Sequence, residues 1–275
     1  MNRKSVIPCL FAVLPLFTIG QTYSQRFDQA LNQRDTSSQK QLLAEWKANK
    51  PKDADLHIAY FNFFKQRYEA EPDSSVKKEF LSQAFSHIDE GIANFPNRLD
   101  MPLFKVALLG EAGRYEAYSQ AILALLNRHD VVKDGWLWKN GAPLVNATDF
   151  LLQYVDNFVV QLYNLQDESL HRYMDEISMR ILRSYPTHIP SLSNLAITAL
   201  YHKDYEKGIG YLEKSRAIDA TNTSVLSNLA YAYAQIGQTD TAIKYYEEVI
   251  KYGDSQTQDY ARKQIEKLAT SSKNP

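Results

Sequence analysis

Cysteine is almost absent from this sequence, because Cys9 is the only one among 275 residues. A lone cysteine cannot form a disulfide within the chain, so we expect packing alone to stabilise the fold. An oxidising compartment would neither help nor harm such a chain.

Catalytic signatures are also missing. The sequence contains no HExxH motif, P-loop, GxSxG turn, CxxC pair or Gly-rich nucleotide turn. The six histidines are scattered, and the nearest approaches to a cluster are His87 with Asp89 and Glu90, and His171 with Glu168. A metal or catalytic site needs three or more convergent groups, so we interpret these as solvated helix pairs. We therefore expect no catalysis, metal or cofactor.

The N-terminal 20 residues have the pattern of a secretory signal peptide. A basic stretch at residues 2–4 precedes an uncharged apolar run at 6–19. Small residues at the end of this run match the positions that a signal peptidase recognises, which predicts cleavage before Gln21. A retained membrane helix is the weaker alternative, because the run is shorter than the roughly 20 residues that span a bilayer and contains two prolines. A lipoprotein signal is a second alternative, but Pro8 stands before Cys9 where a small residue is needed. We expect an exported protein, periplasmic or secreted.

No strong charge of one sign remains after removal of this segment. The rest of the chain has 29 basic and 32 acidic residues, a formal charge of −3. This balance is too mild to indicate a nucleic-acid or anionic-membrane surface.

A repeat of 34 residues dominates the C-terminal half. Leu-Ser-Asn-Leu-Ala occurs at residues 192–196 and again at 226–230. Small residues follow at matching offsets, with Gly208 in one repeat and Ala242 in the next. This pattern closely resembles the tetratricopeptide repeat (TPR) family. The resemblance implies an all-α fold, a right-handed α-solenoid of stacked antiparallel helix pairs, which typically binds proteins.

The period can be followed outward over most of the chain. Repeats at 189–222 and 223–256 are the clearest, and a degenerate one precedes them, ending at Tyr185-Pro186. Upstream, Gly113–Ala117 has the pattern of a turn between paired helices. In total we count six helix pairs in a single solenoid over residues 21–270. An amphipathic segment at 254–269 predicts a C-terminal capping helix, and residues 271–275 a disordered tail.

The period fails between residues 131 and 154. This predicted insertion contains Trp136 and Trp138 beside turn-forming residues. Insertions in repeat proteins often form the binding face, so both tryptophans are candidate protein-binding residues. The alternative is structural, with the indoles fastening the insertion to the solenoid, since large aromatic side chains are more often buried than displayed.

The resemblance also implies a concave groove lined by the first helix of each repeat. Carried over to the last two repeats, the groove positions include further candidate protein-binding residues: Asn194, Asn228, Tyr201, Tyr231 and Gln235. An asparagine amide can donate to and accept from a peptide backbone. Some family members use Lys and Arg here to bind a C-terminal carboxylate, but this chain has none at these positions in its last two repeats. Tyr, Ser and Asn suit neutral or basic peptide segments instead.

These observations favour an exported, non-catalytic scaffold or adaptor that binds a protein or peptide, without nucleic acid and without stable membrane insertion. One alternative is a structural subunit of an envelope complex. Another is an enzyme or small-molecule-binding protein with its site at the insertion. The sequence does not identify the partner or the oligomeric state.

Overall fold

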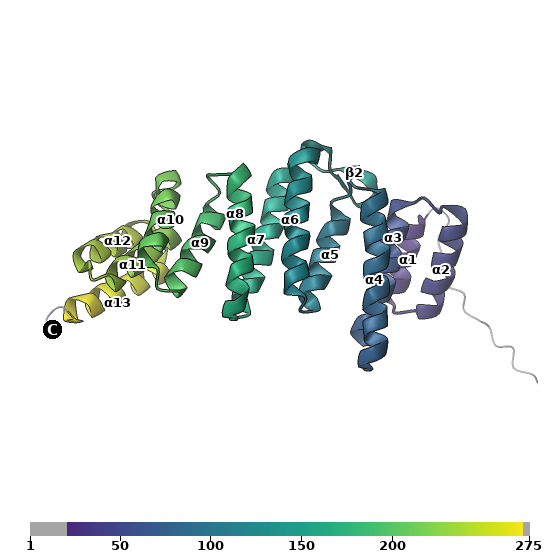
Figure 1. The fold of residues 1–275 in the computed structure, drawn as a ribbon, viewed down its shortest axis with the longest axis horizontal. Coiled ribbons are helices and arrows are strands. Elements are labelled where there is room, and N and C mark those ends of the chain that lie inside the picture. The colour runs from purple at the N-terminus through teal and green to yellow at the C-terminus, as the bar shows by residue number, and fades with distance from the viewer. Residues whose placement is uncertain (1–20, 272–275) are drawn as a thin grey trace, which may run out of the picture. The chain divides into compact units, whose positions relative to one another are not determined.

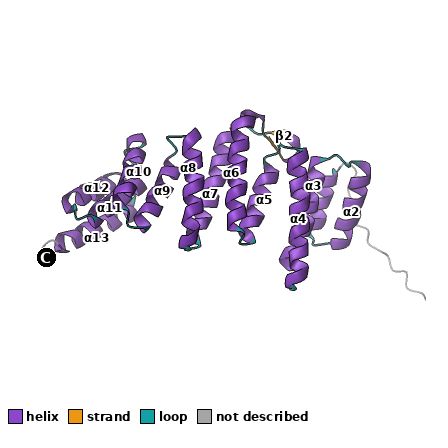
Figure 2. Cartoon of the chain, viewed as in Figure 1, coloured by secondary structure: helices purple, strands orange, loops and turns teal. Residues whose placement is uncertain are grey.

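The structure, a computed structural model, describes residues 21–271. Thirteen α-helices account for most of this part of the chain (Figures 1 and 2), which confirms the all-α prediction. The predicted signal peptide and the last four residues of the predicted tail lie outside the described residues.

The described chain divides into two compact units. Unit 1 contains residues 21–96 together with 139–141, and unit 2 contains residues 97–138 and 142–271. Each has its own succession of antiparallel helices.

Unit 1 consists of two helix pairs. They are α1 (Tyr23–Asn32) with α2 (Thr36–Asn49), and α3 (Ala54–Ala70) with α4 (Ser74–Asn94). The 3-10 turn η2 (Lys139–Gly141) also belongs to this unit. Phe27, Trp46 and Leu56 lie in its core, and the Trp46 indole donates to the Asp53 carboxylate at 3.0 Å. A buried indole N–H thus has its acceptor in the residue that caps α3.

Unit 2 contains the remaining helices. They are α5 (Asp100–Glu111), α6 (Tyr115–Val132), α7 (Ala147–Asn164), α8 (His171–Ser184), α9 (Ile189–Tyr201), α10 (Tyr205–Ile218), α11 (Thr223–Gln235), α12 (Thr239–Tyr252) and α13 (Ser255–Ser271). The turn η3 (Glu168–Leu170) joins α7 to α8. The helices α9–α10 and α11–α12 fall within the two clearest repeats of the sequence.

The repeated Leu-Ser-Asn-Leu-Ala motif forms the buried stripe of α9 and α11. In α9, Leu192, Leu195 and Ala196 are at most 3% exposed, and their counterparts in α11 are fully buried. This spacing of three and four residues places one face of each helix against its neighbours. The small alanine permits close approach of the second helix of each pair.

The interruption between α6 and α7 is shorter than the sequence predicted. It comprises η1 (Lys133–Gly135), β1 (Leu137–Trp138), η2 and β2 (Ala142–Pro143), and α7 already begins at Ala147. Residues 147–154, which we expected in the insertion, form the first two turns of α7, where Leu151 and Leu152 are buried. The helix extends upstream of the repeat frame because its apolar stripe continues there.

The short strands hold the interruption in place. They pair antiparallel, with Leu137 opposite Pro143 and Trp138 opposite Ala142. Leu137 also bonds to the segment before α5, donating to Asn97 O at 2.8 Å and accepting from the Leu99 amide at 2.9 Å. The interruption therefore has a defined backbone conformation.

The last helix, α13, packs on α12 and occupies the capping position expected from the sequence. Ala261 is fully buried in the same core cluster as Tyr246 and Val249, and Ile265 and Leu268 pack at its edge.

Candidate protein-binding surface

Two helices of unit 2, α9 and α11, position five of the predicted contact residues. α11 starts at an N-cap, Asn222, whose side chain accepts from the Val225 amide at 3.2 Å. α9 has proline in its first turn, where a missing N–H costs nothing. Each helix buries its leucines and most of its alanines, and none of the five predicted residues belongs to this buried set.

Asn194 and Asn228 occupy the same register position, 34 residues apart, on equivalent helices. Both side chains are half-buried, and neither amide forms a hydrogen bond with any described residue. Neither contributes a fully buried unsatisfied atom. Each amide is therefore open to an external donor or acceptor.

The three other predicted residues on these helices are exposed. Tyr201 is 55% exposed and Tyr231 is 42% exposed. Gln235 is exposed as well, and its side-chain oxygen accepts a long hydrogen bond, 3.4 Å, from the hydroxyl of Tyr205. Tyr201 lies at the end of α9 and Tyr231 lies within α11. An exposed tyrosine offers a large apolar ring for contact and a hydroxyl for hydrogen bonding.

The ring of Tyr201 contacts two histidines, His171 and His202, which lie far apart in the sequence. Its ring lies edge-on to His171, 4.6 Å between centroids, and His171 Nδ1 lies 3.3 Å from His202 Nε2. His202, in turn, lies 3.4 Å from a Glu168 carboxylate oxygen. We had expected His171 to pair with Glu168, but a residue 31 positions away intervenes, which only the packing of α8 on α9 could reveal.

His87 in unit 1 also differs from the expectation of a solvated pair. Its ring is stacked with those of Tyr60, at 4.4 Å, and Phe64, at 5.5 Å. Burial lowers the pKa of this imidazole, since the charged form loses hydration. Within residues 21–271, no group of three or more potential ligands is arranged to hold a metal ion.

The two tryptophans of the interruption have structural surroundings. Trp136 is 1% exposed, and its indole donates to His129 Nδ1 at 2.9 Å. Trp138 is half-buried and packs edge-on against Phe150, 4.9 Å between centroids. Trp136 thus has no surface for a partner in this structure, and its position favours the structural alternative that we had weighed against binding. Trp138 retains partial exposure.

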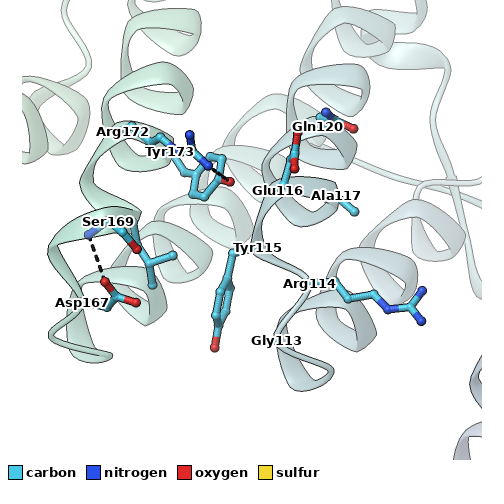
Figure 3. Close-up of a pocket in the computed structure, with 11 residues that line it drawn as sticks. Gly113, Arg114, Tyr115, Glu116, Ala117, Gln120, Asp167, Ser169, Arg172 and Tyr173 are labelled. Atoms are coloured by element: carbon cyan, nitrogen blue, oxygen red, sulfur yellow. Dashed lines mark hydrogen bonds between the residues drawn. The ribbon is translucent and has the colours of Figure 1, made fainter. Parts of the chain in front are cut away.

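An open cavity of about 600 Å³ lies elsewhere in unit 2, between the α5–α6 turn and the start of α8 (Figure 3). Tyr115 and Tyr173 line it together with Glu116, Arg172 and Asp167. Its charged groups are partly engaged, since Arg172 donates to the Tyr173 hydroxyl and the Ser169 amide donates to Asp167. Hydrogen bonds from Ser169 hold the pKa of Asp167 below its ordinary value.

The sequence predicted a turn at one side of this cavity but not the cavity itself. Gly113–Ala117 carried the family's turn pattern, but nothing marked its proximity to residues about 50 positions later. The lining mixes both signs of charge without a convergent catalytic set, so it gives no specific chemistry.

Comparison with known proteins gives information on the fold. No protein-family model matches the sequence, and no curated protein matches it significantly. Among solved structures, the C-terminal part of a TPR repeat-containing protein from Cytophaga hutchinsonii has a TM-score of 0.53 at 16% identity, covering 91% of this chain and 89% of that one.

Two further TPR structures align less closely. YrrB, described as a TPR protein with an unusual peptide-binding site, gives a TM-score of 0.45 at 12% identity over 80% of this chain and 97% of its own. PilF of Pseudomonas aeruginosa gives 0.40 at 15% identity over 88% and 96%.

The chain has the fold of tetratricopeptide-repeat proteins, a fold of stacked helix pairs. Among the described helices, we find none that combines the length and apolar character required to cross a bilayer.

Proposed function

From this TPR fold we propose that the chain is a non-catalytic adaptor of the cell envelope, which binds a neutral or basic peptide segment along α9 and α11. The observation that carries the proposal is the pair Asn194 and Asn228. Their amides stand at one register position, lack partners among the described residues, and are accompanied by exposed Tyr201 and Tyr231. Repeated unpaired amides can hold an extended backbone at regular intervals.

The lack of cations around Asn194 and Asn228 favours a ligand without excess negative charge. Pro190, Ser224 and Ile197 stand where a carboxylate-binding groove would need cations. The preceding repeat adds acidic groups, with Asp156 lying 3.4 Å from His188 Nε2 and Asp167 exposed. A neutral or basic segment meets no charge repulsion here.

A pull-down from the organism's own envelope fraction, with the full chain as bait, tests the site. The double variant Asn194→Ala, Asn228→Ala should lose at least tenfold in recovery of the partner, because each lost hydrogen bond to the backbone weakens binding by about 1 kcal/mol. Its melting temperature should remain unchanged. The control, Lys214→Ala with Glu247→Ala, removes exposed side chains from α10 and α12 and should retain the partner. Equal recovery by both variants would place the site elsewhere.

The envelope location rests on the apolar segment before Gln21. N-terminal sequencing of protein isolated from the periplasm or medium should begin near Gln21. A product that retains residues 1–20, or that is found only inside the cell, would remove this part of the proposal.

The structural-subunit alternative predicts a different assembly. This alternative would be favoured if one partner is recovered at fixed stoichiometry, in a complex that survives gel filtration. The complex should then be equally stable with both variants described above.

A further inference from the structure

Unit 1 contains a cavity of about 310 Å³ at the α1–α2 turn and the C-terminal end of α3. It is lined by Arg34, Thr36, Gln66, Arg67, Glu69 and Ala70. Its volume is about ten times the ~30 Å³ that one water occupies in the liquid. It is therefore large enough for a small polyatomic group.

The two arginines of this cavity have no anionic partner within residues 21–271. Among the described residues, neither guanidinium forms a hydrogen bond or an ion pair. Arg67 instead lies over the rings of Phe63, at 4.2 Å, and Phe80, at 5.8 Å. Burial lowers its pKa, and no carboxylate opposes that effect. A guanidinium has five donors in a planar fork, which are left available here.

The nearby carboxylates are already engaged. Glu69 lies 2.5 Å from Lys65 Nζ one turn earlier on α3. Asp35 caps α2 by accepting from the Ser37 and Ser38 amides, both at 3.1 Å, and from the Ser38 hydroxyl at 2.6 Å. The arginines therefore contribute two positive charges that the surroundings do not compensate through direct contact.

The walls of the cavity are held by a buried amide network. Gln39, 1% exposed, donates to Ala30 O at 3.1 Å and to the Gln66 side chain at 3.0 Å. Gln66 in turn donates to Leu31 O at 2.9 Å. These bonds join α2 and α3 to the end of α1, immediately before Arg34. A preformed site loses little conformational entropy when a ligand binds.

The cavity of unit 2 provides a comparison. Its Arg172 donates to Tyr173, and the carboxylates of Glu116 and Asp167 share its lining. Positive charge there is partly paired, whereas neither guanidinium of the unit 1 cavity has a hydrogen-bond or ion-pair partner among the described residues.

We propose that Arg34, Arg67 and the Thr36 hydroxyl form a binding site for a dianionic oxyanion of the phosphate type, free or carried as a monoester on a larger molecule. Two guanidiniums match the charge of a dianion, and their forks match the geometry of its oxygens. A monoanionic carboxylate would leave one cation uncompensated. This site is distinct from the α9–α11 surface and does not depend on it.

The variants can be chosen so that loss of binding is separable from loss of folding. Arg34 has a φ of 54°, the left-handed region in which glycine is favoured, so Arg34→Gly removes the cation without disfavouring the turn. Arg67→Met removes the second cation but keeps an unbranched apolar side chain between Phe63 and Phe80. Lys203→Gly is the matched control, because Lys203 is a cation at a turn with a φ of 62° in unit 2.

Isothermal titration calorimetry of the full chain in chloride buffer, with inorganic phosphate, O-phosphoserine and acetate as probes, tests the site. We expect saturable binding of phosphate or O-phosphoserine, reduced about tenfold or more by Arg34→Gly and by Arg67→Met and unchanged by Lys203→Gly. Thermal melting should show that Arg34→Gly is at least as stable as the parent chain, because glycine is favoured at this φ.

The two phosphate probes distinguish the sources. Tighter binding of O-phosphoserine would indicate a monoester on a larger molecule, and tighter binding of phosphate the free ion; either result supports the site. Three results would overturn it: no saturable binding of either probe, affinities in the Arg34 and Arg67 variants equal to that of Lys203→Gly, or acetate binding as tightly as phosphate.

Discussion

At the scale of single residues, the His129 side chain links the interruption to two helices. An indole N–H can only donate, so His129 Nδ1 must accept the bond from Trp136. The remaining ring proton is then on Nε2, which lies 3.0 Å from the Thr148 hydroxyl oxygen and donates to it. The neutral tautomer is fixed by these partners. Protonation of His129 would place a hydrogen on Nδ1, facing the indole N–H of Trp136, and this hydrogen bond would be lost.

We predict that this arrangement weakens in acid. Burial lowers the pKa of His129 below its unfolded value of about 6.5, so its contribution to stability is complete above that pH. The contribution is lost as the pH falls through 6.5 toward the lower folded pKa. Urea unfolding from pH 8 to pH 5 should show the stability advantage of the parent chain over His129→Asn shrinking. A difference that stays constant with pH would contradict the assignment.

Gly208 shows how a single position depends on its neighbour in space. A Cβ at this residue would lie 2.7 Å from Leu200 Cδ2 and 3.0 Å from Leu200 Cγ. In the next repeat the equivalent residues are Ala242 and Ala234, so a larger second-helix residue is matched there by a smaller partner. The sequence revealed both small positions but not this exchange of volume.

We predict a coupling between these two positions. Gly208→Ala overpacks the helix crossing, and Leu200→Ala leaves a cavity, so each alone carries a packing cost of roughly 1–5 kcal/mol. The double variant reproduces the small pair of the next repeat and should be more stable than the sum of the single effects by about 0.5–3 kcal/mol. Chemical denaturation of all four proteins measures this term. Strict additivity would show that the two side chains do not compete for space.

At the scale of elements, five of the turns between paired helices have the same backbone conformation. A residue with positive φ stands two positions after the first helix: Arg34, Gly113, Gln166, Lys203 and Gly237, with φ between 54° and 76°. In four of the five, the following residue donates back to a carbonyl of the helix end, for example Asp204 to Ala199 O at 2.9 Å and Gln238 to Tyr233 O at 2.9 Å. This pattern satisfies carbonyls that the helix leaves open.

Only two of these turn positions are glycine, which gives a paired prediction. Lys203→Gly should stabilise the chain by up to about 1 kcal/mol, because a left-handed residue costs roughly 1–2 kcal/mol and glycine loses part of that gain in entropy. Gly237→Ala should destabilise it by about 1 kcal/mol for the same reason. Apart from Gly237 itself and its two chain neighbours, no described residue has a heavy atom within 4 Å of a Cβ at this position, so the change tests backbone conformation alone. Denaturant midpoints that move in the same direction would refute this account.

The interruption marks the limit of element prediction from this sequence. Its tryptophans and turn residues indicated an irregular segment, and the structure contains one. Its end was misplaced because α7 continues an apolar stripe upstream of the 34-residue frame. The burial of Trp136 could not be predicted either, since its acceptor His129 lies on α6 and had no distinguishing pattern.

At the scale of the whole molecule, a stack of repeats needs a closed end. In unit 2, α13 covers α12 with Ala261, Ile265 and Leu268 and turns charged residues outward. Without it, the face of α12 that includes Tyr246 and Val249 would meet water.

We predict that removal of this cap is costly. A chain ending at Gly253 should have a free energy of unfolding several kcal/mol lower than that of the full chain. Its melting temperature should fall by at least about 5 °C. A chain ending at Thr270 keeps all of these contacts and should melt like the full chain. Circular dichroism melting compares the two, and equal melting temperatures would mean that α13 is not a cap.

The sequence by itself determined the class of this protein. The 34-residue period, with leucine and small residues at fixed offsets, specifies paired helices because these intervals follow from helical geometry and local packing. It also placed Tyr201, Tyr231 and Gln235 on the surface of α9 and α11, where all three are exposed. The tertiary structure alone decided which distant groups meet: the fixed tautomer of His129, the exchange of volume between Gly208 and Leu200, and the two guanidiniums that share one cavity without a carboxylate partner in the described part of the chain. These features arise between helices, where no periodicity in the chain records which residues become neighbours.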